Sequence, residues 1–138
     1  MKILVCHDGS EKAQSALERT IALFGQLKPQ LILVTVAEEP LDASSHDEDS
    51  FEAWRATREE GLRKAAEQVT EHGLDVDAIL AIGDPRKMLV EAVRKRKPDI
   101  LVITSRPPKG GVRFGNVTVS VSDYLLHHVD DCAVLVMQ

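Results

Sequence analysis

Five short runs of the chain are apolar at almost every position, and segments of helical spacing separate them. The runs cover residues 2–6, 31–36, 75–82, 99–103 and 132–137. A strand with one face in water alternates apolar and polar residues, whereas a strand covered on both faces is apolar throughout. The runs therefore predict an α/β fold, an open parallel sheet of five strands with helices on both faces.

Between these runs, apolar residues recur at steps of three and four, which is typical of amphipathic helices. We expect four helices: one from Ser10 to the vicinity of Gly25, one from Phe51 to about His72, one from Pro85 to Pro98, and a short one that ends near His128. Ser10 can cap the first helix, and Gly73 is a typical residue just past a helix end.

The length of 138 residues suits one compact domain, so residues 1–138 are expected to form a single unit. A net charge of −5 argues against nucleic acid as a partner. The basic run from Arg94 to Lys97 falls at a predicted helix end, where cations complement the helix dipole. It therefore indicates a solvated helix terminus.

Two absences bear on location. No apolar run approaches the roughly 20 residues that span a bilayer, and the apolar start is too brief for a secretory signal. No membrane is expected as a partner.

Cys6 and Cys132 lie in apolar strands without the spacing of metal ligands. Reduced thiols in a cytoplasmic protein are the simplest interpretation.

Polar residues follow the predicted strands at their carboxyl ends, where open parallel sheets bind ligands. The set includes His7-Asp8, Gly83-Asp84 and Thr104-Ser105, and neither GxxxxGK[ST] nor GxGxxG occurs. A phosphoacceptor receiver domain is disfavoured, because only Asp8 follows the first strand and no lysine ends the fifth. Asp8 has two interpretations, an acceptor for a nucleobase amine or an Asx turn that starts the first helix, and both stay open.

No catalytic residue and no metal site is predicted. Cys6 and His7 are neighbours on a strand, so their side chains face opposite sides and cannot act on one substrate. His127 and His128 diverge on a helix, and no second cluster completes a metal site.

The segment TSRPPKGGVRFGNVTVSVSDY, residues 104–124, is a glycine-rich loop after the fourth strand. Glycines, serines and cations suit a phosphate, whereas Pro107 and Pro108 lack the N–H groups that such a loop uses. The candidate nucleotide-binding residues in and beside it are Ser105, Lys109, Gly110, Gly111, Gly115, Asn116 and Ser120.

Five motifs in order along nearly the whole chain resemble the universal stress protein family. They are KILVCHDGS, LILVTV, IGDPRKMLVEA, KPDILVITSR and YLLHHVDDCAVLVM. The resemblance implies a sheet of order 3-2-1-4-5, a fold like that of the adenine-nucleotide alpha hydrolases, cytoplasmic location, homodimers and a role in survival under stress. In that order Cys6 and Cys132 lie two strands apart, about 9.6 Å, which is too far for a disulfide. Two free thiols are expected.

Members of this family that bind ATP carry glycine, two residues, glycine, nine residues, glycine, then serine or threonine. One alignment places Thr104, Pro107 and Val119 at the glycine positions and keeps only Ser120. A second places Gly115 and Asn116 on the glycine–serine step, with Lys109 and Arg113 able to meet phosphate. Asp8 and Val36 match the family's adenine side. The loop is interpreted as degenerate for ATP, and ATP or another adenine nucleotide is the one cofactor that the resemblance suggests.

The last apolar run, residues 132–137, becomes a sheet edge in this strand order. Exposed apolar edges promote aggregation, and this one has no lysine or proline to prevent pairing. We expect a homodimer in which two copies of the edge pair, through Cys132, Ala133, Val134, Leu135, Val136 and Met137.

The leading functional hypothesis is therefore a non-enzymatic, homodimeric stress-response protein that binds ATP weakly or not at all. One alternative is an adenine-nucleotide-binding switch or slow ATPase that uses Gly110, Gly111 and Gly115. Another is a structural module that binds an unidentified protein partner through the acidic segment of about 37–50.

Overall fold

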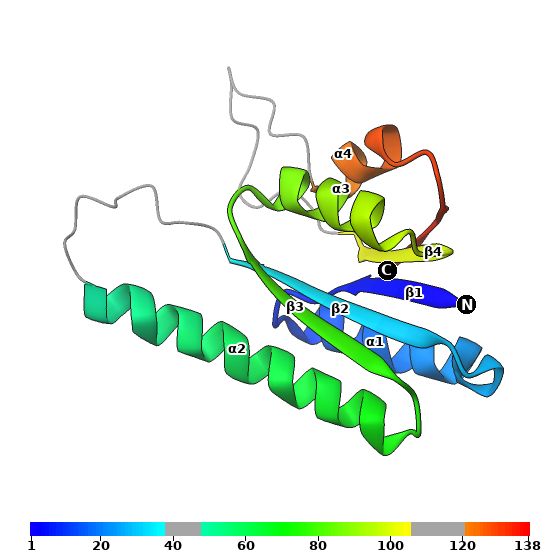
Figure 1. The fold of residues 1–138 in the computed structure, drawn as a ribbon, viewed down its shortest axis with the longest axis horizontal. Helices are drawn as coiled ribbons and strands as arrows, with labels where there is room; N and C mark the ends of the chain where they lie inside the picture. Colours follow the sequence, from blue (N-terminus) through cyan, green and yellow to red (C-terminus); the bar gives the residue numbers. More distant parts are fainter. Residues whose placement is uncertain (38–47, 106–120) are drawn as a thin grey trace.

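The computed structural model describes residues 1–37, 48–105 and 121–138. Within these ranges, five parallel strands form one sheet of order β3-β2-β1-β4-β5 (Figure 1). The fold class and strand order expected from the sequence are confirmed. The strands are β1 Lys2–Cys6, β2 Gln30–Ala37, β3 Val76–Ile82, β4 Ile100–Thr104 and β5 Ala133–Met137.

The helices cover both faces of the sheet. α1 and α2 lie on one face, and α3 and α4 lie on the other (Figure 1). Their bounds are α1 Glu11–Phe24, α2 Glu48–Glu71, α3 Pro85–Arg96 and α4 Val121–His128, with a 3₁₀ turn at Gly25–Leu27. All four helices are close to the expected segments.

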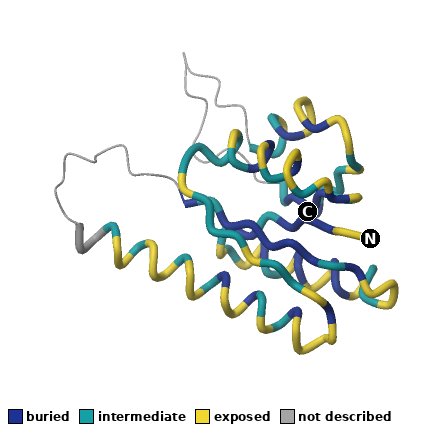
Figure 2. Tube along the Cα trace, in the orientation of Figure 1, coloured by how far each residue is buried: buried dark blue, intermediate teal, exposed yellow. Residues whose placement is uncertain are grey.

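The central strand β1 explains why the runs are uniformly apolar. Ile3 and Val5 join a buried cluster with α1 and α2, whereas Leu4 between them joins a second cluster with α3 and α4. All three side chains are fully buried. Figure 2 shows the same pattern, with burial concentrated in the strands and exposure on the outer sides of the helices. Each of these three positions therefore requires an apolar residue.

The helix ends follow the expected local chemistry. Ser10 caps α1, because its hydroxyl accepts a hydrogen bond from the Ala13 N–H at 3.1 Å. Asp84 caps α3 in the same way through the Arg86 N–H at 3.1 Å. Gly73, with φ of 74°, follows α2 in the left-handed region that favours glycine.

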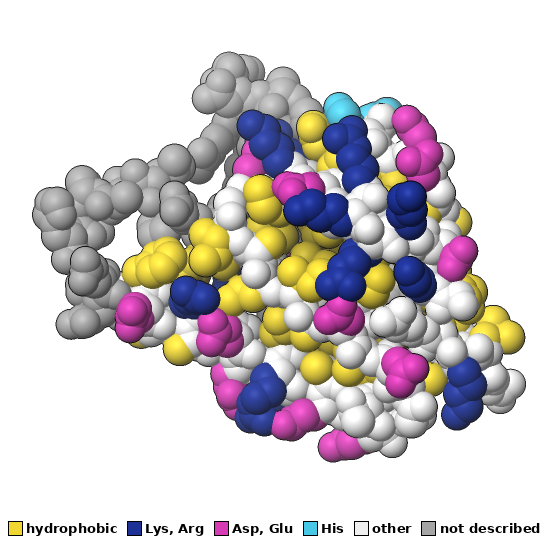
Figure 3. All heavy atoms as spheres, in the orientation of Figure 1, with side chains coloured by type: hydrophobic (Ala, Val, Ile, Leu, Met, Phe, Trp, Pro, Cys, Tyr) yellow, Lys and Arg dark blue, Asp and Glu magenta, His cyan; other side chains and the backbone are white. Residues whose placement is uncertain are grey.

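The basic run is a helix end, as predicted. Arg94, Lys95 and Arg96 form the last turn of α3, and Lys97 follows it in a left-handed conformation. Lys and Arg side chains gather over α3 on the face seen in Figure 3. Cations at this end complement the carbonyl end of the helix dipole.

The largest boundary difference concerns α2, which begins at Glu48 and not at Phe51. Its first three residues, Glu-Asp-Ser, carry no apolar residue, so hydrophobic spacing cannot reveal that the helix has already begun. The strand bounds differ from the expected ones by a single residue at some ends, which is the ordinary variation at the ends of such elements.

Cys6 and Cys132 are both free thiols, as predicted. They are two strands apart, and the register places Val136, not Cys132, level with Cys6. In the described part of the chain, no helix combines the length and the apolar character needed to cross a membrane.

Candidate functional site

The winding of the sheet reverses between β1 and β4, so the crevice beyond their carboxyl ends is the expected ligand site. The loop after β1, residues 7–10, forms one side of this crevice. The end of β4, at Thr104 and Ser105, forms the other. The Lys12 ammonium, in the first turn of α1, donates to the Ser105 carbonyl oxygen and joins the two sides. Sequence reasoning missed Lys12, because nothing in its local pattern indicates this distant contact.

Asp8 makes the Asx turn that was one of its two interpretations. Its Oδ1 accepts a hydrogen bond from the Ser10 N–H at 2.9 Å, which prepares the start of α1. Its backbone carbonyl oxygen accepts from the Arg58 guanidinium of α2. The Asp8 side chain therefore has a structural role, and α2 fixes the backbone of the same residue.

Val36, the other residue matched to the adenine side, is half-buried near the end of β2. It packs partly against the cluster under α3 and α4. Its neighbour Thr35 donates its hydroxyl to the His7 carbonyl oxygen at 2.7 Å. This bond attaches the 7–10 loop to β2, so Val36 and the 7–10 loop belong to adjoining strand ends.

Ser105 is half-buried, and its N–H donates to the Met137 carbonyl oxygen at 3.1 Å. The other candidates of the glycine loop, Lys109, Gly110, Gly111, Gly115, Asn116 and Ser120, lie outside the described residues. The structure thus describes the adenine-side strand ends of the expected site and one residue of the phosphate side.

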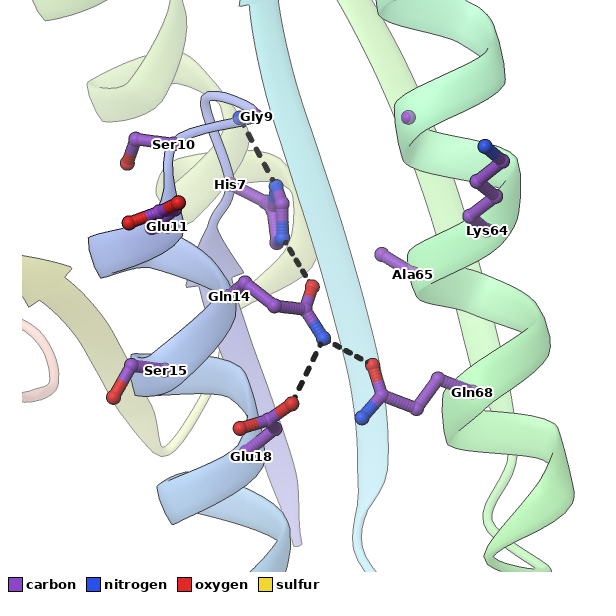
Figure 4. A pocket seen from close by; sticks show the side chains of 11 residues that line it. His7, Gly9, Ser10, Glu11, Gln14, Ser15, Glu18, Lys64, Ala65 and Gln68 are labelled. Atoms are coloured by element: carbon purple, nitrogen blue, oxygen red, sulfur yellow. Dashed lines mark hydrogen bonds between the residues drawn. The ribbon is translucent and has the colours of Figure 1, made fainter.

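A groove of about 530 Å³ lies on the other side of the 7–10 loop, between α1 and α2 (Figure 4). The loop, one side of α1 and one side of α2 line it. Its inner wall includes the His7 ring, which is only 5% exposed. Sequence reasoning placed His7 among the polar strand-end residues but assigned no role to it.

Cys6 and His7 face opposite sides of the sheet, as predicted. Cys6 packs against the cluster under α3 and α4, whereas His7 lines the groove between α1 and α2. Desolvation by burial raises the pKa of the Cys6 thiol to about 12. Cys6 is therefore protonated at neutral pH, a state that is a poor nucleophile.

Metal-binding groups are also sparse: within residues 1–37, 48–105 and 121–138, no group of three or more His, Cys, Asp and Glu could hold an ion. His127 and His128 are exposed at the end of α4. The His128 ring stacks on Tyr124 with centroids 3.8 Å apart, and its Nδ1 lies 2.8 Å from the Tyr124 carbonyl oxygen. This histidine contributes to the packing of the helix end.

Comparison with known proteins gives a consistent result. The model of the Universal stress protein family matches residues 1–138. The universal stress protein Sll1388 of Synechocystis sp. is 28% identical, over 99% of this chain and 97% of its own length. The universal stress protein YxiE of Bacillus subtilis is 25% identical, over 99% and 98% of the two chains.

Solved structures share the fold. A universal stress protein family member of Burkholderia pseudomallei superposes with a TM-score of 0.76 at 24% identity, covering 99% of this chain and 94% of its own. A family protein of Arabidopsis thaliana with AMP bound has a TM-score of 0.69 at 19% identity, covering 99% and 90%. A universal stress protein in complex with cAMP has a TM-score of 0.71 at 20% identity, covering 100% and 96%.

Proposed function

This chain belongs to the Universal stress protein family, and from that premise we propose that it is a cytoplasmic, homodimeric stress-response protein that binds ATP weakly or not at all. The proposal assigns it no catalytic activity. The observation that carries it is the unequal state of the two halves of the nucleotide crevice: the adenine side keeps the family's residues, and the phosphate side does not.

The adenine side consists of the 7–10 loop and the end of β2. Asp8 and Val36 stand at the positions that match the family, and the Thr35 hydroxyl joins the two strand ends at 2.7 Å. These contacts support a preformed surface that could receive a purine ring. They also leave Asp8 engaged with the Ser10 N–H at 2.9 Å, which limits what its carboxylate can offer to a ligand.

The phosphate side departs from the family at its first positions. Thr104 ends β4 where ATP-binding members have glycine, and Pro107 occupies the second glycine position in the first alignment. A β-branched residue avoids positive φ, and proline provides no N–H to a phosphate. Both changes disfavour a triphosphate.

The second candidate function is an adenine-nucleotide-binding switch or slow ATPase. It is favoured by two structural neighbours, one solved with AMP bound and one solved in complex with cAMP. It is also favoured by Lys12, whose ammonium reaches Ser105 at the crevice. A cation there could hold a single phosphate without the glycine loop.

Titration calorimetry with Mg·ATP and with AMP tests the proposal. We expect ATP to bind with a dissociation constant weaker than about 100 μM or to give no binding heat. The matched control is Val36→Glu, which places a carboxylate on the adenine side and should remove any heat that arises at this site. A low-micromolar constant for ATP that Val36→Glu abolishes would replace the proposal with the second candidate.

A further inference from the structure

We infer that His7 is a positioning residue for the loop that carries Asp8, and that it holds this loop only while its imidazole is neutral. The inference deepens the proposed function, because the 7–10 loop forms the adenine side of the crevice. The contacts that carry it lie at the groove between α1 and α2 (Figure 4).

The hydrogen bonds of His7 determine its protonation state. The Gly9 backbone N–H donates to His7 Nδ1 at 3.1 Å, and a backbone N–H can only donate. Nδ1 therefore carries no proton, so the ring proton is on Nε2. Nε2 lies 3.0 Å from Gln14 Oε1 and donates to it.

Gln14 gives an independent check of this direction. Its amide nitrogen lies 3.4 Å from Glu18 Oε1 and also contacts Gln68 Oε1. An ionised carboxylate only accepts hydrogen bonds, so the Glu18 contact requires the amide nitrogen of Gln14 on that side. The Gln14 oxygen then faces His7. The chain of bonds runs one way, from Gly9 through His7 and Gln14, and it joins α1 to α2 (Figure 4).

The 7–10 loop is held on this side by contacts with two helices. His7 accepts from the Gly9 N–H and bonds to Gln14 of α1, and Arg58 of α2 donates to the Asp8 carbonyl oxygen. Gly9 itself has φ of 84°, a conformation that other residues adopt only at a cost. The backbone of Asp8 and Gly9 is therefore held by contacts made from the groove.

Protonation of His7 would reverse the bond to the loop. An imidazolium has N–H groups on both nitrogens, so Nδ1–H would face the Gly9 N–H, donor against donor. Histidine side chains ordinarily change charge between about pH 5 and 8. The groove is open to solvent, so a proton can reach the buried ring. The bond to Gly9 is therefore present at high pH and lost as the pH falls.

Charged groups of both signs lie around the groove that this ring lines. Asp8 neighbours it on the chain, Glu11 and Glu18 line the groove from α1, and Lys64 lines it from α2. Arg58 of α2 contacts the next residue.

The test measures the hydrogen-exchange protection of the Gly9 amide by NMR between pH 5 and 8, with intrinsic exchange corrected for pH. In the natural protein we expect protection to fall about tenfold toward pH 5, the size of one lost hydrogen bond. His7→Asn supplies an amide oxygen that does not titrate, so its protection should not change with pH. His7→Phe should be unprotected throughout, and His128→Asn, which alters an exposed histidine, should behave as the natural protein.

Equal Gly9 protection across this pH range in the natural protein would overturn the inference, and this arm needs no variant to fold. The inference is also overturned if the protection of the Gly9 amide in His7→Asn still depends on pH. AMP titrations at pH 8 and 5 separate the two proposals. If Gly9 behaves as expected and AMP affinity falls in parallel only when His7 is present, both stand. If Gly9 behaves as expected and AMP does not bind at either pH, His7 still positions the loop, and the adenine side of the proposed function is wrong.

Discussion

The sheet has two edge strands, β3 and β5, and they carry different side chains. β3 includes Asp77, whose carboxylate pairs with Arg96 of α3 at 2.5 Å. Charged side chains are among the features that keep sheet edges from pairing with other chains. Residues 133–137 of β5 are all apolar, and only Met137 among them is buried. One edge is thus protected by charge, and the other is left without it.

The hydrogen bonds of β5 show which groups its open side presents. The Ala133 N–H donates to Asp99, and Met137 accepts from the Ser105 N–H. Since alternate residues of a parallel strand bond to the same neighbour, Ala133, Leu135 and Met137 bond to β4. The N–H groups of Val134 and Val136 therefore point away from the sheet. This apolar edge supports the proposed homodimer, with these two residues as donors.

The largest effect is expected just inside the β5 edge. Leu101 of β4 is fully buried and pairs with Val134. Leu101→Ala should lower the free energy of unfolding by about 2–5 kcal/mol, because it leaves a cavity in the core. Val134→Ala should cost less at low protein concentration, since its side chain is only partly buried. Urea unfolding measures both.

The concentration dependence of the same experiment sharpens the comparison. If a second copy covers Val134, the loss of unfolding free energy caused by Val134→Ala rises with protein concentration. The loss caused by Leu101→Ala should not depend on concentration, because dimerisation stabilises this variant and the natural protein equally. A cost of Val134→Ala that is independent of concentration would contradict the assigned interface.

The next effect concerns the dimer itself. Val134→Pro or Val136→Pro removes an outward donor, and by symmetry the dimer loses two hydrogen bonds. We expect the dimer dissociation constant to rise about 100-fold, at roughly 1.4 kcal/mol for each bond. Size-exclusion chromatography with light scattering, at a protein concentration on the order of tens of micromolar, measures whether each variant is a monomer or a dimer.

The matched control lies on the other edge. Gly83 donates to Ala37 and Leu31 donates to Asp75, so the N–H of Ala78 points outward from β3. Ala78→Pro makes the same change at the protected edge and should leave the dimer intact. A natural protein that is monomeric at these concentrations would refute the interface, as would dissociation caused by Ala78→Pro alone.

The smallest effect is expected at the β3 ion pair. Asp77 and Arg96 are each more than one-third exposed, so solvent screens their attraction. Asp77→Asn should cost less than about 1 kcal/mol of unfolding free energy, and the difference should vanish at high salt. Thermal melts at two salt concentrations measure it. A larger cost would mean that the pair stabilises the fold as well as protecting the edge.

Much of the fold could be predicted from local patterns. The run Ile3-Leu4-Val5 has no polar position, and the structure buries alternate residues in two different clusters. Ser10 and Asp84 cap helices where the sequence contains turn signals. The start of α2 was missed because Glu48 and the residues after it carry no apolar spacing. Hydrophobic patterns depend on apolar residues, so they miss helical turns that carry none.

The candidate site was less predictable. The sequence left Asp8 between two interpretations, and the 2.9 Å bond from the Ser10 N–H established the Asx turn. Nothing near Lys12 indicated its contact with Ser105. His7 was recognised as a strand-end polar residue, yet its role depends on Gln14 and, through it, on α2.

The sequence by itself determined the elements, their approximate bounds and the coverage of both sheet faces, because these depend on periodicities within short segments. The family resemblance supplied the strand order. Only the tertiary structure decided which polar groups meet. His7, Gln14 and Gln68 come from three elements, and Lys12 is distant in sequence from Ser105. Such contacts depend on the register of strands and the placement of helices across the sheet, and no short-range pattern encodes either.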